Sequence, residues 1–97
     1  MNTSVTRSFP PKRARQFLAF CLLQDGKYQD AVDNFKQVKH IKADQAFSYY
    51  HALSYAYYQL GKWDDAQTAA EAARKYARQA QQIDVAEEML KDVRKAR

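Results

Sequence analysis

A phrase of six residues occurs twice in this chain, and this repetition constrains its fold more than any other feature. Residues 26–31 read GKYQDA and residues 61–66 read GKWDDA, 35 positions further on. Self-similarity at a fixed period of this length is typical of proteins built from small structural units that pack on their neighbours. The repetition therefore predicts two stacked units.

Apolar residues recur at helical spacing on both sides of each glycine, which predicts a helix before and after it. The sets around Gly26 are Phe17, Leu18, Cys21 and Leu22 before it, and Ala31, Val32, Phe35 and Val38 after it. The sets around Gly61 are Tyr50, Leu53, Ala56 and Tyr57 before it, and Ala66, Ala69, Ala70 and Ala73 after it. Glycine permits the positive φ that ends a helix, and Asp64 or Asp65 suits the start of the next one. Each unit is therefore predicted to be a helical hairpin.

The pattern resembles the tetratricopeptide repeat (TPR) over residues 12–79. The second unit supplies Tyr50, Leu53, Ser54, Tyr57, Gly61, Trp63, Ala66 and Ala73, and the first keeps Leu18, Ala19, Leu22, Gly26, Tyr28, Ala31 and Phe35. The chain departs from the family at Ala70, where a large residue is usual, and at Arg78, where a proline often closes the repeat. It also departs at Arg15, where an aromatic residue is usual, and at Val38, where alanine is usual. The resemblance implies an all-α fold of antiparallel helical hairpins stacked as a short TPR-like α-solenoid with about five helices.

The two ends complete the predicted organisation of the chain. Residues 1–9 lack helical periodicity and are expected to be a flexible segment, followed by a TPR-like domain over 10–97. Within the domain, repeat one covers about 12–45, repeat two about 46–80 and a capping helix about 83–96. Pro10 and Pro11 suit the start of the first helix.

The residues Asp84-Val85-Ala86-Glu87 have the pattern of a capping box at the start of the last helix. That helix either covers the final repeat or begins a third repeat, and the chain is either complete or a fragment of a longer repeat protein. The sequence leaves these alternatives open.

Most of the repeated residues have a structural explanation. Ala31 and Ala66 are small because two helices must approach closely there, and Tyr28 and Trp63 fill space beside the turns. The predicted core within the repeats consists of Leu18, Leu22, Leu53 and Tyr57.

The resemblance implies that the first helix of each hairpin lines a concave surface with the residues that packing leaves free. These residues are Arg13, Gln16, Phe20, Leu23, Gln24, Ser48, His51, Tyr55, Tyr58 and Gln59. Four of them, Phe20, Leu23, Tyr55 and Tyr58, are apolar or aromatic, and exposed aromatic clusters are typical of binding patches. We therefore expect a protein-interaction module or adaptor whose groove takes an apolar side chain of a peptide or partner surface.

Two other interpretations of this groove stay open. The last helix or a second copy of the chain could fill it, the latter giving a homodimer, or the residues could be exposed without a role. One TPR variant grips a C-terminal carboxylate with Lys, Asn and Arg on the groove face, and this chain lacks that set. Specificity for a C-terminal carboxylate is therefore not predicted.

The formal net charge of +5 is concentrated in clusters near the helix ends. The clusters are Arg7, Lys12, Arg13 and Arg15; Arg74, Lys75 and Arg78; and Arg94, Lys95 and Arg97. Solvated cations favour the dipole at a helix C-terminus, which is a sufficient structural reason for the second cluster. A nucleic-acid contact ranks below protein binding because no recognition-helix, RNP-type or zinc motif is present, and an acidic protein partner explains the charge equally well.

Catalytic and cofactor signals are weak throughout. Cys21 is the one cysteine, so no internal disulfide forms, a reducing and therefore cytoplasmic location fits best, and its place on an apolar stripe favours packing. The two histidines, His40 at the expected end of the second helix and His51, do not pair with Cys21, and no metal or phosphate motif occurs. We expect no enzymatic activity, no cofactor, no metal and, without an apolar run of about 20 residues, no membrane span.

Overall fold

The described part of the chain consists entirely of helices and their connections. The computed structural model describes residues 12–97, with side chains from residue 16 onward, and the expectations for residues 1–11 lie outside this part. The elements are α1 (Lys12–Gln24), α2 (Tyr28–Phe35), α3 (Ala43–Gln59), α4 (Trp63–Tyr76) and α5 (Ala80–Ala96). The prediction of an all-α fold with five helices is confirmed.

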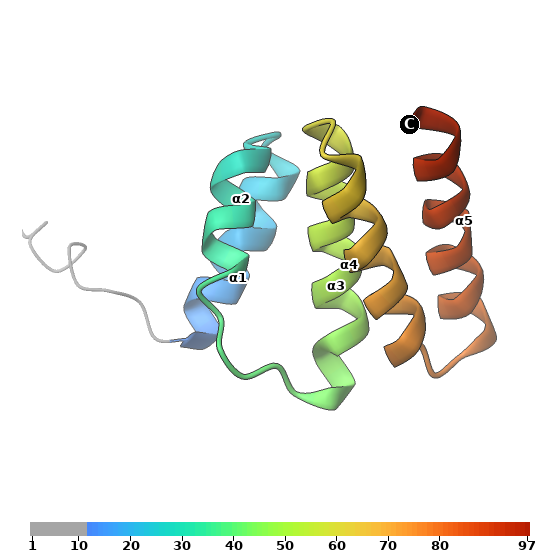
Figure 1. Cartoon of the computed structure of the whole chain (residues 1–97). Coiled ribbons are helices and arrows are strands. Elements are labelled where there is room, and N and C mark those ends of the chain that lie inside the picture. Colours follow the sequence, from blue (N-terminus) through green and yellow to red (C-terminus); the bar gives the residue numbers. More distant parts are fainter. Residues whose placement is uncertain (1–11) are drawn as a thin grey trace, which may run out of the picture.

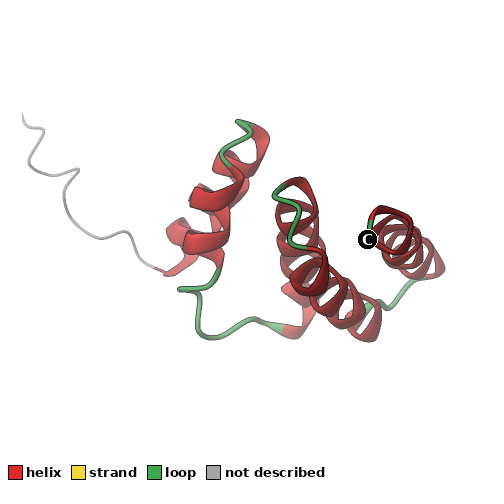
Figure 2. Cartoon of the chain, turned by 45° about the horizontal axis from the view of Figure 1, so that its top comes forward, coloured by secondary structure: helices red, strands yellow, loops and turns green. Residues whose placement is uncertain are grey.

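The helices stand side by side as two hairpins followed by a single helix (Figure 1). The α1–α2 hairpin packs on the α3–α4 hairpin, and α5 follows on the far side; the same order is seen in Figure 2. Helix α3 is central because it contacts each of the other four, whereas α1 and α5 do not meet within the described residues.

Both hairpins turn in the same way at their glycines. The φ angles of Gly26 and Gly61 are 80° and 76°, and no other described residue has a positive φ. The N–H of Lys27 donates to the Leu22 carbonyl and that of Lys62 to the Tyr57 carbonyl, each at 2.9 Å. These bonds satisfy carbonyls that the helix end leaves free, so the repeated glycines act as helix stops, as predicted.

The contact between α3 and α4 is built from small residues. Ala56 on α3 and Ala66 on α4 have no exposed surface. Between them the buried Ser54 hydroxyl donates a hydrogen bond of 3.0 Å to the Ala66 carbonyl. Because a longer side chain at Ala66 would hold the helices apart, the predicted reason for a small residue there agrees with this geometry.

Equivalent positions of the two units are filled differently. Phe35 of α2 is fully buried, its ring lies edge-on to Tyr49 at 5.5 Å, and its carbonyl accepts a hydrogen bond of 2.9 Å from the Tyr49 hydroxyl. The residue 35 positions later is Ala70, which is buried in a second cluster with Met89 and Val93 of α5. The departure of Ala70 from the family pattern therefore accompanies close packing of α5 on α4.

Two expectations for the first hairpin are wrong. Leu18 is 41% exposed, so it is not a core residue as predicted, and the neighbouring Phe17 is 70% exposed. In the second unit the equivalent Leu53 is only 8% exposed because α3 packs on the hairpin before it, whereas no described element precedes α1. Helix α2 also ends at Phe35, so His40 is exposed in the connection to α3 and does not close a helix.

The last helix begins earlier than predicted. Its N-cap is Gln79, which has an extended backbone, and a capping box joins Gln79 and Gln82 in place of the predicted box at 84–87. The Gln82 side chain accepts from the N–H groups of Arg78 and Gln79, at 2.8 and 3.3 Å. Amide side chains therefore satisfy the helix start, and Asp84 lies within the helix.

We predict that Ala66→Leu lowers the free energy of unfolding by about 1–3 kcal/mol, because the added carbons have no space at the α3–α4 contact. Urea unfolding followed by circular dichroism measures this difference. Ala96→Leu, at an exposed position near the end of α5, is the control and should change stability by less than about 0.5 kcal/mol. Equal effects of the two variants would contradict the close-contact explanation.

Candidate functional site

The ten residues of the predicted groove lie on α1 and α3. The nine whose side chains the structure describes share one face of each helix. Arg13 belongs to α1, but its side chain lies outside the described part. The half-buried members are Gln16, Phe20, Leu23, His51 and Tyr58. The exposed members are Gln24, Ser48, Tyr55 and Gln59.

Two apolar residues of the predicted groove, Phe20 and Leu23 of α1, also contact the core. Phe20 lies edge-on to Phe35, with ring centroids 5.1 Å apart, and Leu23 packs against the same core cluster. Each keeps a partly exposed surface. Phe20 and Leu23 therefore form an apolar surface that rests on the core. The sequence pattern predicted that packing would leave both side chains free, whereas each is partly used in packing.

Tyr55 joins the two hairpins on this face. Its side chain is 37% exposed, and its ring lies edge-on to Tyr28 at 6.0 Å. A hydrogen bond between the two phenols raises the pKa of Tyr28. Sequence reasoning assigned Tyr28 only to the turn, since nothing in the sequence places the start of α2 beside the middle of α3.

His51 is held by an aromatic neighbour one helical turn away. The ring stacks on Phe47 with centroids 5.7 Å apart and planes 3° apart. Burial lowers the pKa of His51 below its ordinary value of 6.5, because the charged form loses water. The imidazole is therefore neutral at neutral pH.

His51 also borders an open depression of about 360 Å³ between α3 and α5. The other lining residues all come from α5 and are Asp84, Val85, Glu88, Met89 and Asp92. Their place beside His51 could not be predicted from the sequence, because the position of α5 beside α3 depends on tertiary packing. The i, i+4 spacing of Asp84, Glu88 and Asp92 was the one signal that placed them on a common helix face.

Tyr58 belongs to the predicted groove on α1 and α3 and also packs against the second core cluster, which consists of Ala66, Ala70, Met89 and Val93. Its ring packs against Trp63 at 5.4 Å, with the planes inclined by 62°. Trp63 begins α4, so Tyr58 is anchored beside the second turn while part of its surface stays accessible. Tyr55 and Tyr58 are thus each supported by an aromatic residue from a neighbouring helix.

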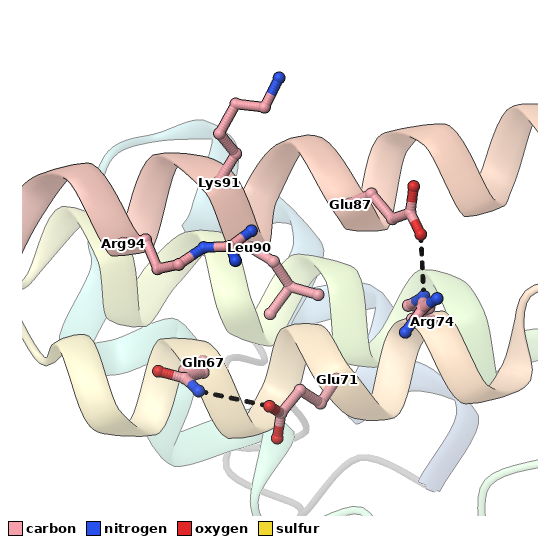
Figure 3. Close-up of a pocket in the computed structure, with 7 residues that line it drawn as sticks. All are labelled: Gln67, Glu71, Arg74, Glu87, Leu90, Lys91 and Arg94. Carbon is pink, nitrogen blue, oxygen red and sulfur yellow. Dashed lines mark hydrogen bonds and ion pairs between the residues drawn. The ribbon is translucent and has the colours of Figure 1, made fainter.

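A second depression lies between α4 and α5 and is mostly charged (Figure 3). An ion pair of 3.1 Å joins Arg74 to Glu87 across it, and the Gln67 amide donates to Glu71 at 3.3 Å. The remaining lining residues are Leu90, Lys91 and Arg94. The ion pair between Arg74 and Glu87 joins the two helices.

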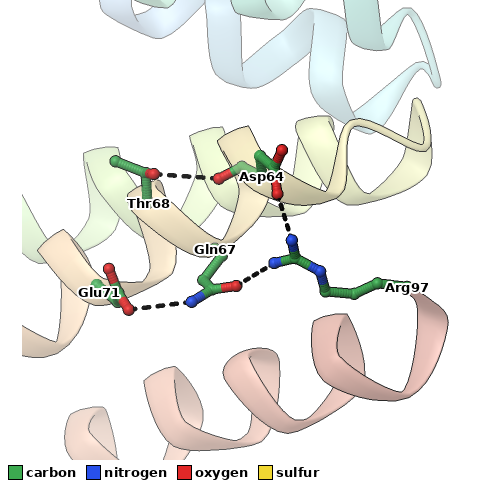
Figure 4. A network of polar contacts seen from close by, with 5 residues as sticks. All are labelled: Asp64, Gln67, Thr68, Glu71 and Arg97. Atoms are coloured by element: carbon green, nitrogen blue, oxygen red, sulfur yellow. Dashed lines mark hydrogen bonds and ion pairs between the residues drawn. The ribbon is translucent and has the colours of Figure 1, made fainter.

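The C-terminal residue extends this network. The Arg97 guanidinium donates to Gln67 and forms an ion pair with Asp64, and the Thr68 hydroxyl donates to the Asp64 carbonyl at 3.1 Å (Figure 4). Exposed pairs of this kind contribute about 0–1 kcal/mol each. They give Arg74 and Arg97, two cations of the basic clusters, a structural role.

Other site types have little support in the described residues. Between residues 12 and 97 no group of three His, Cys, Asp or Glu side chains could hold a metal ion. Cys21 is a half-buried free thiol. No helix in this part of the chain has the length and apolar character that crossing a membrane requires.

Comparison with known families gives one match. A family model described as "SusR N-terminal TPR domain" covers residues 9–93 of the chain. No curated protein and no solved structure gives a significant match.

The lowered pKa of His51 predicts a pH dependence of stability. A depressed pKa in the folded state stabilises the protein above the unfolded value of 6.5, and this contribution is lost as the pH falls through the folded value. We therefore expect the free energy of unfolding to fall between about pH 7 and pH 5, and to fall less in His51→Gln.

Urea unfolding at both pH values measures the stability difference, and an NMR titration of the His51 ring protons gives its midpoint. A midpoint at or above 6.5 in the native protein would contradict the prediction.

Proposed function

The chain belongs to the family of the SusR N-terminal TPR domain, and from this premise we propose that it is an adaptor that binds a peptide or partner surface on its α1–α3 face. TPR domains generally mediate protein–protein interaction and act as non-enzymatic scaffolds. The proposal assigns the binding role to the ten predicted residues, led by the four apolar or aromatic ones.

The main observation behind the proposal is that two tyrosines on α3, Tyr55 and Tyr58, are each held in place by an aromatic ring of a neighbouring helix. Tyr55 presents 37% of its surface beside Tyr28, and Tyr58 is anchored on Trp63. A tyrosine whose ring is already positioned offers apolar area and a hydroxyl at little cost in conformational entropy. Such residues are typical anchors of protein interfaces.

The surrounding polar residues suit recognition of a main chain. Gln24 and Gln59 are exposed on α1 and α3, and His51 is neutral with a ring nitrogen available as donor or acceptor. In this proposal they hydrogen-bond the backbone or polar groups of the bound segment, while Phe20 and Leu23 contact an apolar side chain.

A second candidate function is self-association, and one observation favours it. Phe17 and Leu18 expose 70% and 41% of their surface on α1. Covering them with the same face of a second copy would bury apolar area in a homodimer. Nucleic-acid contact through the basic ends ranks below both, and a cytoplasmic location suits the free cysteine.

The adaptor role predicts that Tyr55→Ala and Tyr58→Ala each weaken partner binding by about 1–3 kcal/mol while the fold is kept. The partner probe comes from a displayed random-peptide selection on the wild-type domain, followed by affinity measurement with the enriched peptide. Tyr76→Ala is the matched control, because Tyr76 lies on α4 and is 39% exposed.

Three outcomes would contradict this prediction. Failure to enrich any peptide argues against an open groove, and unfolding of both tyrosine variants would make these residues core. Equal losses of affinity in the Tyr76 control would place the binding surface elsewhere. Light scattering over a range of concentrations tests the homodimer separately.

A further inference from the structure

The depression between α3 and α5 has an apolar floor. Met89 is 8% exposed and belongs to the second core cluster, so its position is fixed by the packing of α5. Val85 is 37% exposed beside it, and the His51 ring, stacked on Phe47, closes the α3 side. The volume of about 360 Å³ is within the range of small binding pockets.

Three carboxylates of α5 lie beside this floor. Asp84, Glu88 and Asp92 follow one another at a spacing of four residues, and all three line the depression. No lysine or arginine lines it. In residues 16–97 the ion pairs are formed by other carboxylates, so these three are not neutralised by a cation within ion-pair distance.

The two depressions beside α5 therefore differ in charge. Glu87, Lys91 and Arg94 of α5 line the one toward α4, where both signs of charge are present (Figure 3), whereas the charged residues that line the one toward α3 are all acidic. This negative surface occurs in a chain whose formal net charge is +5. His51 does not offset it, because burial lowers the pKa of His51 and leaves the ring neutral at neutral pH.

We infer that the depression between α3 and α5 receives a lysine or arginine side chain from a basic segment of a protein partner. The methylene stem lies over Met89 and Val85, and the charged group meets Glu88, Asp92 and Asp84. Uncompensated carboxylates beside an apolar floor are complementary to a side chain that is apolar along its length and cationic at its tip. The inference rests on the proposed function and adds the chemistry of the partner to it.

The test uses the full chain and a displayed library of random peptides as the probe. Selections are run on the wild type, on the triple variant Asp84→Asn/Glu88→Gln/Asp92→Asn, and on the control Asp25→Asn/Asp33→Asn, which removes exposed carboxylates outside the depression. These substitutions keep the side-chain shape, and circular dichroism checks that each variant is folded. Fluorescence anisotropy then gives the affinity of the leading peptide for each protein.

We expect lysine or arginine to be enriched among peptides selected on the wild type and on the control, and not on the triple variant. The leading peptide should bind the triple variant at least about tenfold more weakly, since each lost charge-assisted bond contributes to affinity. Raising the salt from about 50 to about 500 mM should weaken wild-type binding and have little effect on the triple variant.

The outcomes distinguish this inference from the function on which it rests. Enriched peptides without basic residues, or basic peptides that bind the triple variant equally well, overturn the inference and leave the peptide-binding role intact. If no peptide is enriched on any protein, both fail. Self-association that is lost in the triple variant also overturns the inference, because the occupant is then a basic region of a second copy.

Discussion

The close contact between α3 and α4 is the constraint on which the rest of the structure depends. The Ser54 hydroxyl reaches the Ala66 carbonyl only because Ala56 and Ala66 let the two helices approach. This contact fixes the orientation of α3, and α3 is the helix on which the other four pack. The exposed face of α3, with Tyr55 and His51, is therefore presented by a rigid element, which suits a preformed binding surface.

Helix α5 has two structural roles: it packs on α4, and it lines the depression beside His51. Its buried residues Met89 and Val93 pack against Ala66 and Ala70 of α4. Its neighbouring face forms one wall of the depression beside His51. The small side chain of Ala70 links the two roles, because it lies in the α4–α5 cluster at the position that Phe35 fills in the first unit. A departure from the repeat pattern thus coincides with the packing of α5 on α4.

The helix architecture could largely be predicted, because its determinants are local. Glycines that adopt positive φ and apolar residues at helical spacing identified the hairpins without any long-range information. The errors fell where burial depends on a neighbour. Leu18 and Leu53 are the same residue type at the same repeat position, yet one is exposed and the other buried, because within the described residues a hairpin precedes and covers only Leu53. The start of α5 was misplaced because glutamine side chains, less common caps than serine or aspartate, close its first turn.

By itself the sequence determined the repeat, its period, the helix-stopping glycines, the all-α class and the helix faces that carry the ten candidate residues. Only the tertiary structure decided which side chains share a surface. It brought Tyr28 to Tyr55 across two hairpins, placed Asp84, Glu88 and Asp92 opposite His51, and placed Lys91 and Arg94 at the depression between α4 and α5. The physical reason is that helix formation is encoded in nearby residues, whereas a surface shared by two helices depends on how their buried faces pack, and that packing involves the whole chain.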